Sequence, residues 1–176
     1  MAGINKREDV LKKIGEIYPL LSNEDKIIAD DLHDLALGWD MKIGIGFRNN
    51  AANTKTHYDI QYSAKKPFLR MAFLFRICVT ENEANPTFKV ILKLLNIDKY
   101  RPIAEACPDN IKYLITTGKE CDSCNPSCTK QMVFVLDGVS HNLCTFAGGV
   151  YENLSTDEWH IIKTLIIEDY KAHTAI

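Results

Sequence analysis

Four of the six cysteines in this chain lie close together in the sequence. Three fall within eight residues and the fourth follows sixteen positions later: Cys121, Cys124, Cys128 and Cys144. Thiolates bind Zn2+ and iron strongly, and the two-residue gap between the first pair lets both sulfurs reach one metal from a single turn. Residues 1–9 contain no apolar stretch typical of a secretory signal. Without that signal, thiols at this density are expected to serve metal or redox chemistry.

A structural zinc site needs four ligands at the corners of a tetrahedron. Cys144 is predicted to lie in the second strand of a hairpin that doubles back at Asp137-Gly138, which returns it toward the cysteine-rich segment. His141 is an alternative ligand, but its odd separation from Cys144 places it on the opposite face of the strand. The spacing therefore predicts one structural Zn2+ held by Cys121, Cys124, Cys128 and Cys144.

The same thiols fit other states. They could be free with no metal, they could form disulfides on oxidation, or they could hold an iron–sulfur cluster, although the spacing differs from the common ferredoxin runs. Cys121 and Cys124 have the spacing of a redox dithiol, so the alternative function is a thiol-based redox protein or sensor. Cys78 and Cys107 are expected to be small buried side chains instead of ligands.

The elements that position these residues can be predicted from periodicity. Apolar residues at helical spacing predict helices over 5–18 and 22–37, with Ser22 as N-cap and Gly38 as the stop of the second helix. The second helix is expected to bury Ile27, Ile28, Leu32, Leu35 and Ala36. Alternating residues predict strands over 41–48, 57–63, 68–80 and 88–95. Short connections between them predict an antiparallel four-stranded meander with the N-terminal helices packed on one face, which is an α+β fold.

The C-terminal part is predicted to contain short helices over 97–106 and 109–117, then the cysteine loop and the hairpin around Asp137-Gly138. A terminal helix starts at Ser155, which forms a capping box with Glu158. Its expected buried stripe comprises Trp159, Ile162, Leu165, Ile166 and Tyr170. We expect a single domain over residues 1–176, in which 1–101 form the helices and sheet and 102–176 form a second lobe.

The face of the sheet opposite the core carries several basic residues: His57, Arg70, Arg76, Lys89 and Lys93. Gly44 and Gly46 would leave a shallow floor beside them, which suits close approach by a flat ligand. These cations favour an anionic small molecule or protein partner, and the alternative is an ordinary solvated sheet face. The face lacks the row of aromatics typical of RNA-binding sheets, so nucleic acid is not a predicted partner.

The sequence contains none of the common catalytic motifs, such as a nucleophile elbow, a P-loop or a zinc-protease helix motif, so an enzyme is not predicted. Hydrophobic residues make up 46% of the chain, the net charge is −2, and no apolar run is long enough to span a bilayer. These values are typical of a soluble cytoplasmic protein with no membrane partner, a compartment in which thiols stay reduced.

The order of elements is similar to that of small uncharacterised bacterial proteins of the YdhG and YjbR type. The run Lys119-Glu120-Cys121, followed by the other cysteines and the Asp137-Gly138 hairpin, resembles a cysteine-bearing C-terminal tail found in some uncharacterised bacterial proteins. This tail covers about a third of the chain. The resemblance implies an α+β fold and carries no activity.

Overall fold

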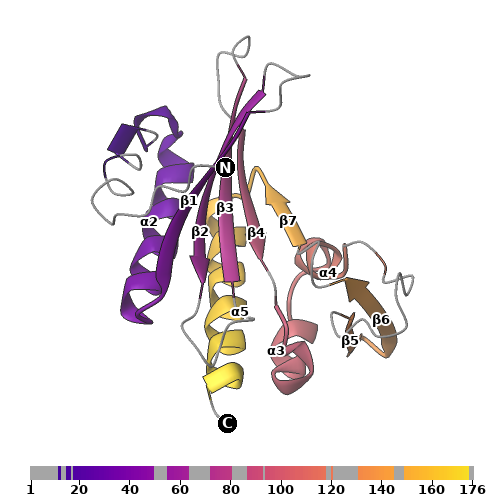
Figure 1. Ribbon diagram of the computed structural model, residues 1–176. Helices are drawn as coiled ribbons and strands as arrows, with labels where there is room; N and C mark the ends of the chain where they lie inside the picture. Colours follow the sequence, from indigo (N-terminus) through magenta and orange to yellow (C-terminus); the bar gives the residue numbers. More distant parts are fainter. Residues whose placement is uncertain are drawn as a thin grey trace. The chain divides into compact units, whose positions relative to one another are not determined.

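The computed structural model describes residues 12, 15–16, 18–49, 55–63, 72–80, 87–92, 94–117, 120, 131–144 and 149–174. The chain divides into two compact units, Met1–Ile91 and Leu92–Ile176. Helices and strands occur in both (Figure 1), so the predicted α+β class is confirmed. The single-domain interpretation stays a prediction. No helix within the described ranges has the length and apolar content needed to cross a membrane.

The first unit contains a short 3-10 helix, η1 (Tyr18–Leu20), and one long helix, α2 (Asn23–Gly38). Ser22 caps α2 as predicted, because its side-chain oxygen accepts a hydrogen bond from the backbone N–H of Asp25 at 3.0 Å. Gly38 is the last helical residue, and the left-handed conformation that follows falls on Asp40, with φ 51°. The helix predicted over 5–18 lies largely outside the described residues.

The buried stripe of α2 differs in part from the prediction. Ile28, Leu32 and Ala36 are buried as expected, and Ala29 joins them. Ile27 was expected to be buried and is 47% exposed, because it lies about 100° around the helix from Ile28, on the side away from Ala29, Leu32 and Ala36. Leu35 is half-buried.

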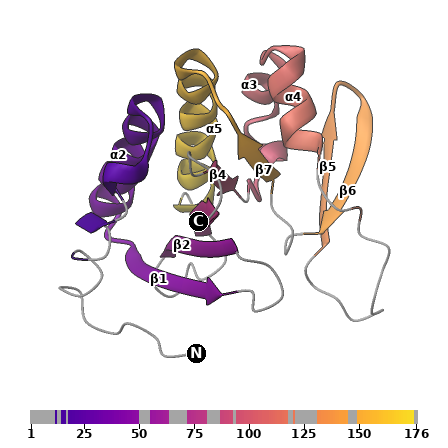
Figure 2. The same ribbon diagram turned by 90° about the horizontal axis from the view of Figure 1, so that it is seen from above.

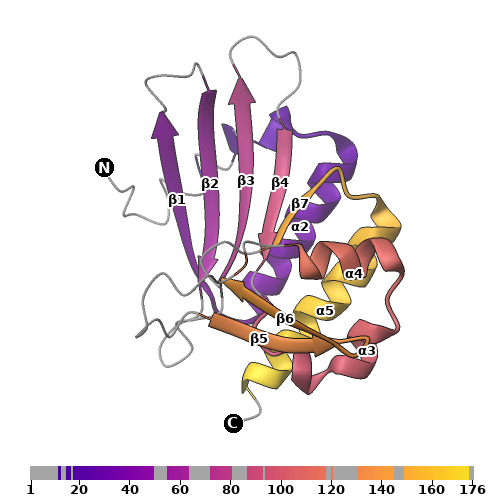
Figure 3. The same cartoon turned by 90° about the vertical axis from the view of Figure 1, so that its right-hand side faces the viewer.

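Four strands complete the first unit: β1 (Lys42–Asn49), β2 (Lys55–Ser63), β3 (Ala72–Thr80) and β4 (Thr87–Leu92). Each pairs antiparallel with the next along the chain. Figure 3 shows these strands face on, with α2 behind them. The face toward α2 is the apolar one. Four of its side chains in this unit, Ile60, Tyr62, Phe88 and Val90, are buried, and Ile43 is half-buried.

The second unit begins with η2 (Ile97–Lys99), α3 (Arg101–Glu105) and α4 (Asp109–Thr116). The strands β5 (Gln131–Leu136) and β6 (Val139–Cys144) form the predicted hairpin, which Figure 2 shows beside α3 and α4. A short strand that was not predicted, β7 (Gly149–Glu152), precedes α5 (Thr156–Thr174). The second unit therefore supplies the one predicted metal ligand that the structure describes, Cys144.

Helix α5 starts as predicted. The Oγ atom of Ser155 accepts from the N–H of Glu158 at 3.3 Å, and the Glu158 carboxylate accepts from the N–H of Ser155 at 2.9 Å. Trp159, Ile162, Leu165 and Ile166 are buried. Tyr170 was expected to complete the buried stripe, but it is half-buried and Asp169 is buried in its place.

Candidate metal centre

Of the four predicted metal ligands, Cys144 is described and the other three lie outside the described residues. Cys144 is the last residue of β6, where it is half-buried and makes no disulfide. Its cross-strand partner is Gln131, the first residue of β5. The ligand predicted to come from the hairpin therefore sits at the end of the hairpin that adjoins the cysteine-rich segment.

The two faces of the hairpin differ in polarity. Cross-strand partners lie on the same face, so Met132 shares a face with Leu143, and Phe134 shares that face with His141. This face is apolar, since Phe134 is 2% and Leu143 8% exposed. Cys144 follows Leu143 and therefore lies on the other face, beside exposed positions such as Ser140. Core packing does not account for Cys144 at this position.

His141 lies on the apolar face and stacks on Phe134, with ring centroids 5.2 Å apart and an interplanar angle of 22°. The prediction that it projects away from the side of Cys144 is confirmed by the register. His141 is therefore not placed to act as the substitute ligand beside Cys144.

Both ends of the cysteine-rich segment are fixed to β6. At one end, Gln131 pairs with Cys144. At the other end, Glu120 forms an isolated antiparallel bridge with Leu143. Because Leu143 also pairs with Met132 of β5, Glu120 and β5 must lie on opposite edges of β6. Glu120 and Gln131, the described residues on either side of the segment 121–130, therefore pair with opposite edges of β6, at Leu143 and Cys144.

Sequence reasoning did not identify Glu120 as an anchor of this segment. A single bridging residue has no periodicity, so no sequence signal distinguishes it from a loop residue.

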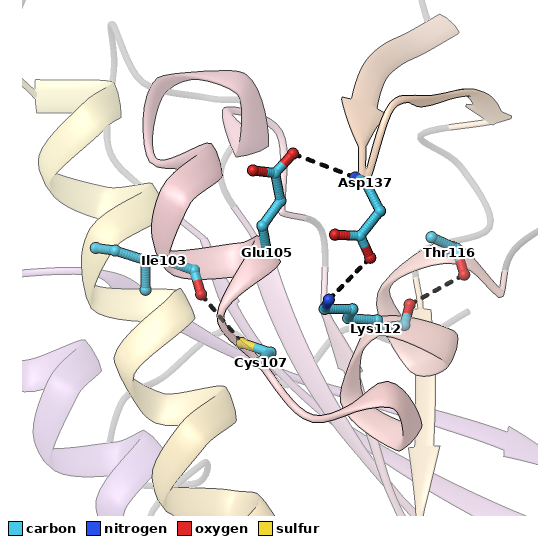
Figure 4. A network of polar contacts seen from close by, with 6 residues as sticks. All are labelled: Ile103, Glu105, Cys107, Lys112, Thr116 and Asp137. Carbon is cyan, nitrogen blue, oxygen red and sulfur yellow. Dashed lines mark hydrogen bonds and ion pairs between the residues drawn. The ribbon is translucent and has the colours of Figure 1, made fainter.

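The second described cysteine of this unit differs from Cys144. Cys107, between α3 and α4, is 8% exposed, and its thiol donates to the carbonyl oxygen of Ile103 at 3.4 Å (Figure 4). Burial raises the pKa of the Cys107 thiol, which disfavours the thiolate that metals bind. The prediction that Cys107 is a small buried side chain is confirmed. The side chain of Cys78, on β3, is outside the described part of the structure.

The turn end of the hairpin is held by charged residues of α3 and α4 (Figure 4). Lys112 Nζ contacts Asp137 Oδ2 at 2.8 Å, and the backbone N–H of Asp137 donates to Glu105 Oε1 at 3.2 Å. Asp137 and Gly138 both have positive φ, 49° and 77°, the pattern of a type I′ turn. The hairpin is thus fixed at its turn independently of the cysteine end.

The predicted ligand-binding residues of the sheet face are described to different degrees. Arg70 and Lys93 lie outside the described residues, and for His57 and Arg76 only the backbone position is described. Lys89 is half-buried on the face opposite Phe88 and Val90. For this face, the structure therefore gives mainly the pairing register of the strands and the burial of Lys89.

That register places Lys89 across from Arg76, and Arg76 across from Asp59. His57 lies one row away, across from Cys78. Three of the predicted basic residues thus occupy neighbouring positions, and Asp59 shares the row of Lys89 and Arg76. Sequence reasoning placed His57 and Arg76 on this face and missed the position of Asp59 beside Arg76, because pairing between strands depends on register and not on local pattern.

No group of three or more His, Cys, Asp or Glu side chains suited to a metal lies together among the residues that the structure describes. Since Cys121, Cys124 and Cys128 are not among those residues, the zinc site stays a prediction. No protein-family model, curated protein sequence or solved structure matches the chain. The resemblance to YdhG- and YjbR-type proteins likewise stays a prediction.

Proposed function

We propose that this chain binds one structural Zn2+ through Cys121, Cys124, Cys128 and Cys144, and that the metal fastens the segment 121–130 to the end of the β5–β6 hairpin. The observation that supports the proposal is the attachment of this segment to both edges of β6, at Leu143 and Cys144. Because the residues on either side of this ten-residue segment pair with β6, its three thiols are within reach of the fourth.

The distances that the chain can span between the anchored residues and the cysteines are short enough for such a site. Cys121 directly follows Glu120, so their Cα atoms are about 3.8 Å apart. Cys128 is three residues from Gln131, which limits their Cα separation to about 11 Å. Paired antiparallel residues are about 4.5–5.5 Å apart. These spans allow the thiols to turn inward toward one metal, with Zn–S bonds of about 2.3 Å.

Zinc would supply stabilisation that the segment lacks. Residues 121–130 contain little apolar side chain beyond the cysteines, so burial of apolar surface can contribute little to their ordering. Binding of zinc to thiolates contributes directly to folding, because the unfolded chain has no preformed site. Thiolate ligands must stay reduced, which supports a cytoplasmic location for the protein.

Metal content of the purified full chain tests the proposal. We expect about one zinc per chain in the wild type, and a loss of most of it in each of Cys121→Ser, Cys124→Ser, Cys128→Ser and Cys144→Ser. Cys107→Ala is the matched control and should keep its zinc, because its thiol is buried elsewhere in the same unit. Measurement is by elemental analysis after exhaustive dialysis.

Other outcomes contradict the zinc proposal and identify a rival. Stoichiometric iron with visible absorbance indicates an iron–sulfur cluster. Metal-free protein in which Cys121 and Cys124 form a reversible disulfide indicates the thiol-based redox protein or sensor. Metal-free protein with four free thiols would show that these cysteines neither bind a metal nor form a reversible disulfide.

The second part of the proposal is that the sheet face of the first unit binds an anionic small molecule or protein partner. The neighbouring positions of Lys89, Arg76 and His57 in the register support it. Phosphate and carboxylate groups are the ligands that such cations favour. This proposal requires only that the strands present one continuous face, as the predicted four-stranded meander does.

A further inference from the structure

Cys78 of β3 lies on the face of the sheet opposite the apolar one, which is the face seen in Figure 3 and is called the polar face below. In the register it pairs with His57 of β2 and with Thr87 of β4. His57 is an odd number of residues from the buried Ile60, and Thr87 directly precedes the buried Phe88. Because successive residues of a strand alternate between faces, all three positions belong to the polar face.

The polar face is accessible to solvent at the positions whose burial is described. Lys42 of β1 is exposed, and Gly44, Lys89 and Ile91 are half-buried. Small solutes can therefore reach this face of the strands. The expectation from sequence was that Cys78 is a small buried side chain, and its place in the register now favours a different role.

The positions around Cys78 on the adjacent strands are mostly basic. His57 lies directly opposite Cys78, and the diagonal positions on β2 are Lys55 and Asp59. Lys89 holds a diagonal position on β4. Directly opposed residues have Cβ atoms about 4.5–5.5 Å apart, and diagonal neighbours are about 7–8 Å apart. Charges at these positions act on the thiol.

Two arginines extend the positive surroundings. Arg76 precedes Cys78 by two residues on β3, which places both on one face about 7 Å apart. Arg48 of β1 lies across from His57. Four cations and an imidazole thus surround one thiol and one carboxylate, that of Asp59. Neighbouring Lys, Arg and protonated His lower the pKa of a thiol from about 8.5 into the range of about 3.5–7.5.

We propose that Cys78 is a nucleophilic thiolate paired with the imidazolium of His57, and that it attacks carbon electrophiles that also carry a carboxylate or phosphate group. The preference for anions rests on the anion binding proposed above for this face, with Arg76 and Lys89 holding the anionic group. Asp59, two residues from His57, favours the protonated imidazole.

The reaction is a displacement at carbon. The sulfur of Cys78 uses an electron pair to form an S–C bond, and the leaving group departs with the electron pair of the bond that breaks. The imidazolium of His57 then gives its proton to the leaving group, so that a thiolate and an imidazolium are consumed and a neutral thio-adduct and a neutral imidazole remain.

His57, Asp59 and Cys78 are also ligand types for zinc. The four cations around them oppose a bound metal ion by charge repulsion and favour a thiolate, so the nucleophile fits this face better than a metal does. A second zinc per chain that is lost in Cys78→Ser would overturn the proposal.

Alkylation of the full chain tests the proposal, with peptide mass spectrometry to separate Cys78 from the other five cysteines. Iodoacetamide is neutral and reports the thiolate fraction. We expect its rate at Cys78 to reach half of its maximum below about pH 7.5. Cys107 is the internal reference in the same sample and should react more slowly, because burial raises the pKa of its thiol.

Iodoacetate carries a carboxylate and tests the preference for anions. The ratio of its rate to that of iodoacetamide cancels the thiolate fraction. We expect this ratio at Cys78 to be about two- to fivefold higher in the folded chain than in the chain unfolded in urea, which is the range of an exposed charge pair. Lys89→Gln should lower the ratio.

His57→Gln should move the midpoint of the iodoacetamide profile toward about 8.5. His160→Gln, at an exposed position of α5, is the matched control and should leave the profile unchanged. If His57→Gln does not fold, the wild-type profile and rate ratio still decide the proposal.

A midpoint at or above about 7.5, a rate ratio equal to that of the unfolded chain, or a Cys78 that reacts only after unfolding overturns the proposal. Calorimetry with inorganic phosphate separates this failure from that of the proposed function. Phosphate binding with an unreactive Cys78 leaves the anion site standing without a nucleophile. A reactive Cys78 with neither phosphate binding nor a preference for iodoacetate refutes the anion site and, with it, the preference proposed for the thiolate.

Discussion

Lys89 occupies the position on β4 across from Arg76, and Arg76 lies across from Asp59 on β2. Directly opposed positions on one face of an antiparallel sheet have Cβ atoms about 4.5–5.5 Å apart, so charges placed there act on one another. A carboxylate in this row offsets part of the attraction of its cations for an anion. At the scale of single residues, Asp59 is therefore expected to oppose the proposed ligand and Lys89 to favour it.

Substitutions in this row should change anion affinity in opposite directions. We expect Lys89→Gln to weaken binding of inorganic phosphate and Asp59→Asn to strengthen it, each by about two- to fivefold, which is the range of an exposed charge pair. Isothermal titration calorimetry at low salt measures the effect. Lys171→Gln, on α5, removes the same charge elsewhere and should leave the affinity unchanged. Equal losses in the Lys89 and Lys171 variants would show that net charge, and not this face, attracts phosphate.

At the scale of elements, the β5–β6 hairpin has two separately fixed ends. Its turn is held by Lys112 and Glu105 through Asp137, and its open end lies beside the cysteine-rich segment. Gly138, with φ 77°, occupies a conformation that L side chains adopt with strain. The turn and the proposed metal site can therefore be perturbed one at a time.

Replacing Gly138 by Ala should lower the free energy of unfolding by about 1–2 kcal/mol, because Ala is strained at positive φ. Zinc content should not change, since the turn lies at the far end of the hairpin from Cys144. Gly38→Ala, at the end of α2 with no atom within 4 Å of the added Cβ, is the control and should be neutral or slightly stabilising. Urea unfolding measures both; equal destabilisation would contradict the turn assignment.

The same elements show what sequence reasoning can reach. The caps at Ser22 and Ser155 and the Asp137-Gly138 turn were predicted because each depends on residues three or fewer positions apart. Strand β7 was missed because four residues are too few for a periodic signal. Asp169 was missed because a pattern treats a polar residue as solvent-facing, and its partners are more than 60 residues away.

For the candidate site, the hairpin that carries Cys144 was predicted from the sequence and is confirmed, and the set of four cysteine ligands stays a prediction. The sequence could not supply the bridge from Glu120 to Leu143 or the position of Asp59 beside Arg76. Both depend on which backbone segments pair across long stretches of chain, and local propensity does not encode that choice.

At the scale of the whole molecule, each compact unit contains one of the two tryptophans. Trp39 follows α2 in the first unit and is half-buried, whereas Trp159 is fully buried in α5 of the second. Trp39→Phe and Trp159→Phe thus give variants whose fluorescence reports on one unit at a time. The proposed metal lies in the second unit, the one that Trp159 reports.

In the Trp39→Phe variant, a zinc chelator should lower the thermal midpoint seen by Trp159 by about 5–10 °C. Metal at a hundred times its Kd stabilises by about 2.7 kcal/mol, and each kcal/mol is worth about 2–4 °C at this chain length. The same measurement with Trp159→Phe follows the first unit. An equal shift there would support the single cooperative domain that the sequence predicts. A Trp159 midpoint unmoved by the chelator contradicts a stabilising metal.

The bridge at Glu120 also dictates an order of assembly. Glu120 and β5 both run antiparallel to β6, so they run in the same direction on either side of it. During synthesis both flanking segments emerge before β6, so neither pairing with β6 can form until this strand has emerged. If the metal is captured early, three thiols hold it with one coordination position open, and Cys144 occupies that position only when the last strand arrives. Pairing of the last strand and closure of the coordination sphere would then be the same folding event.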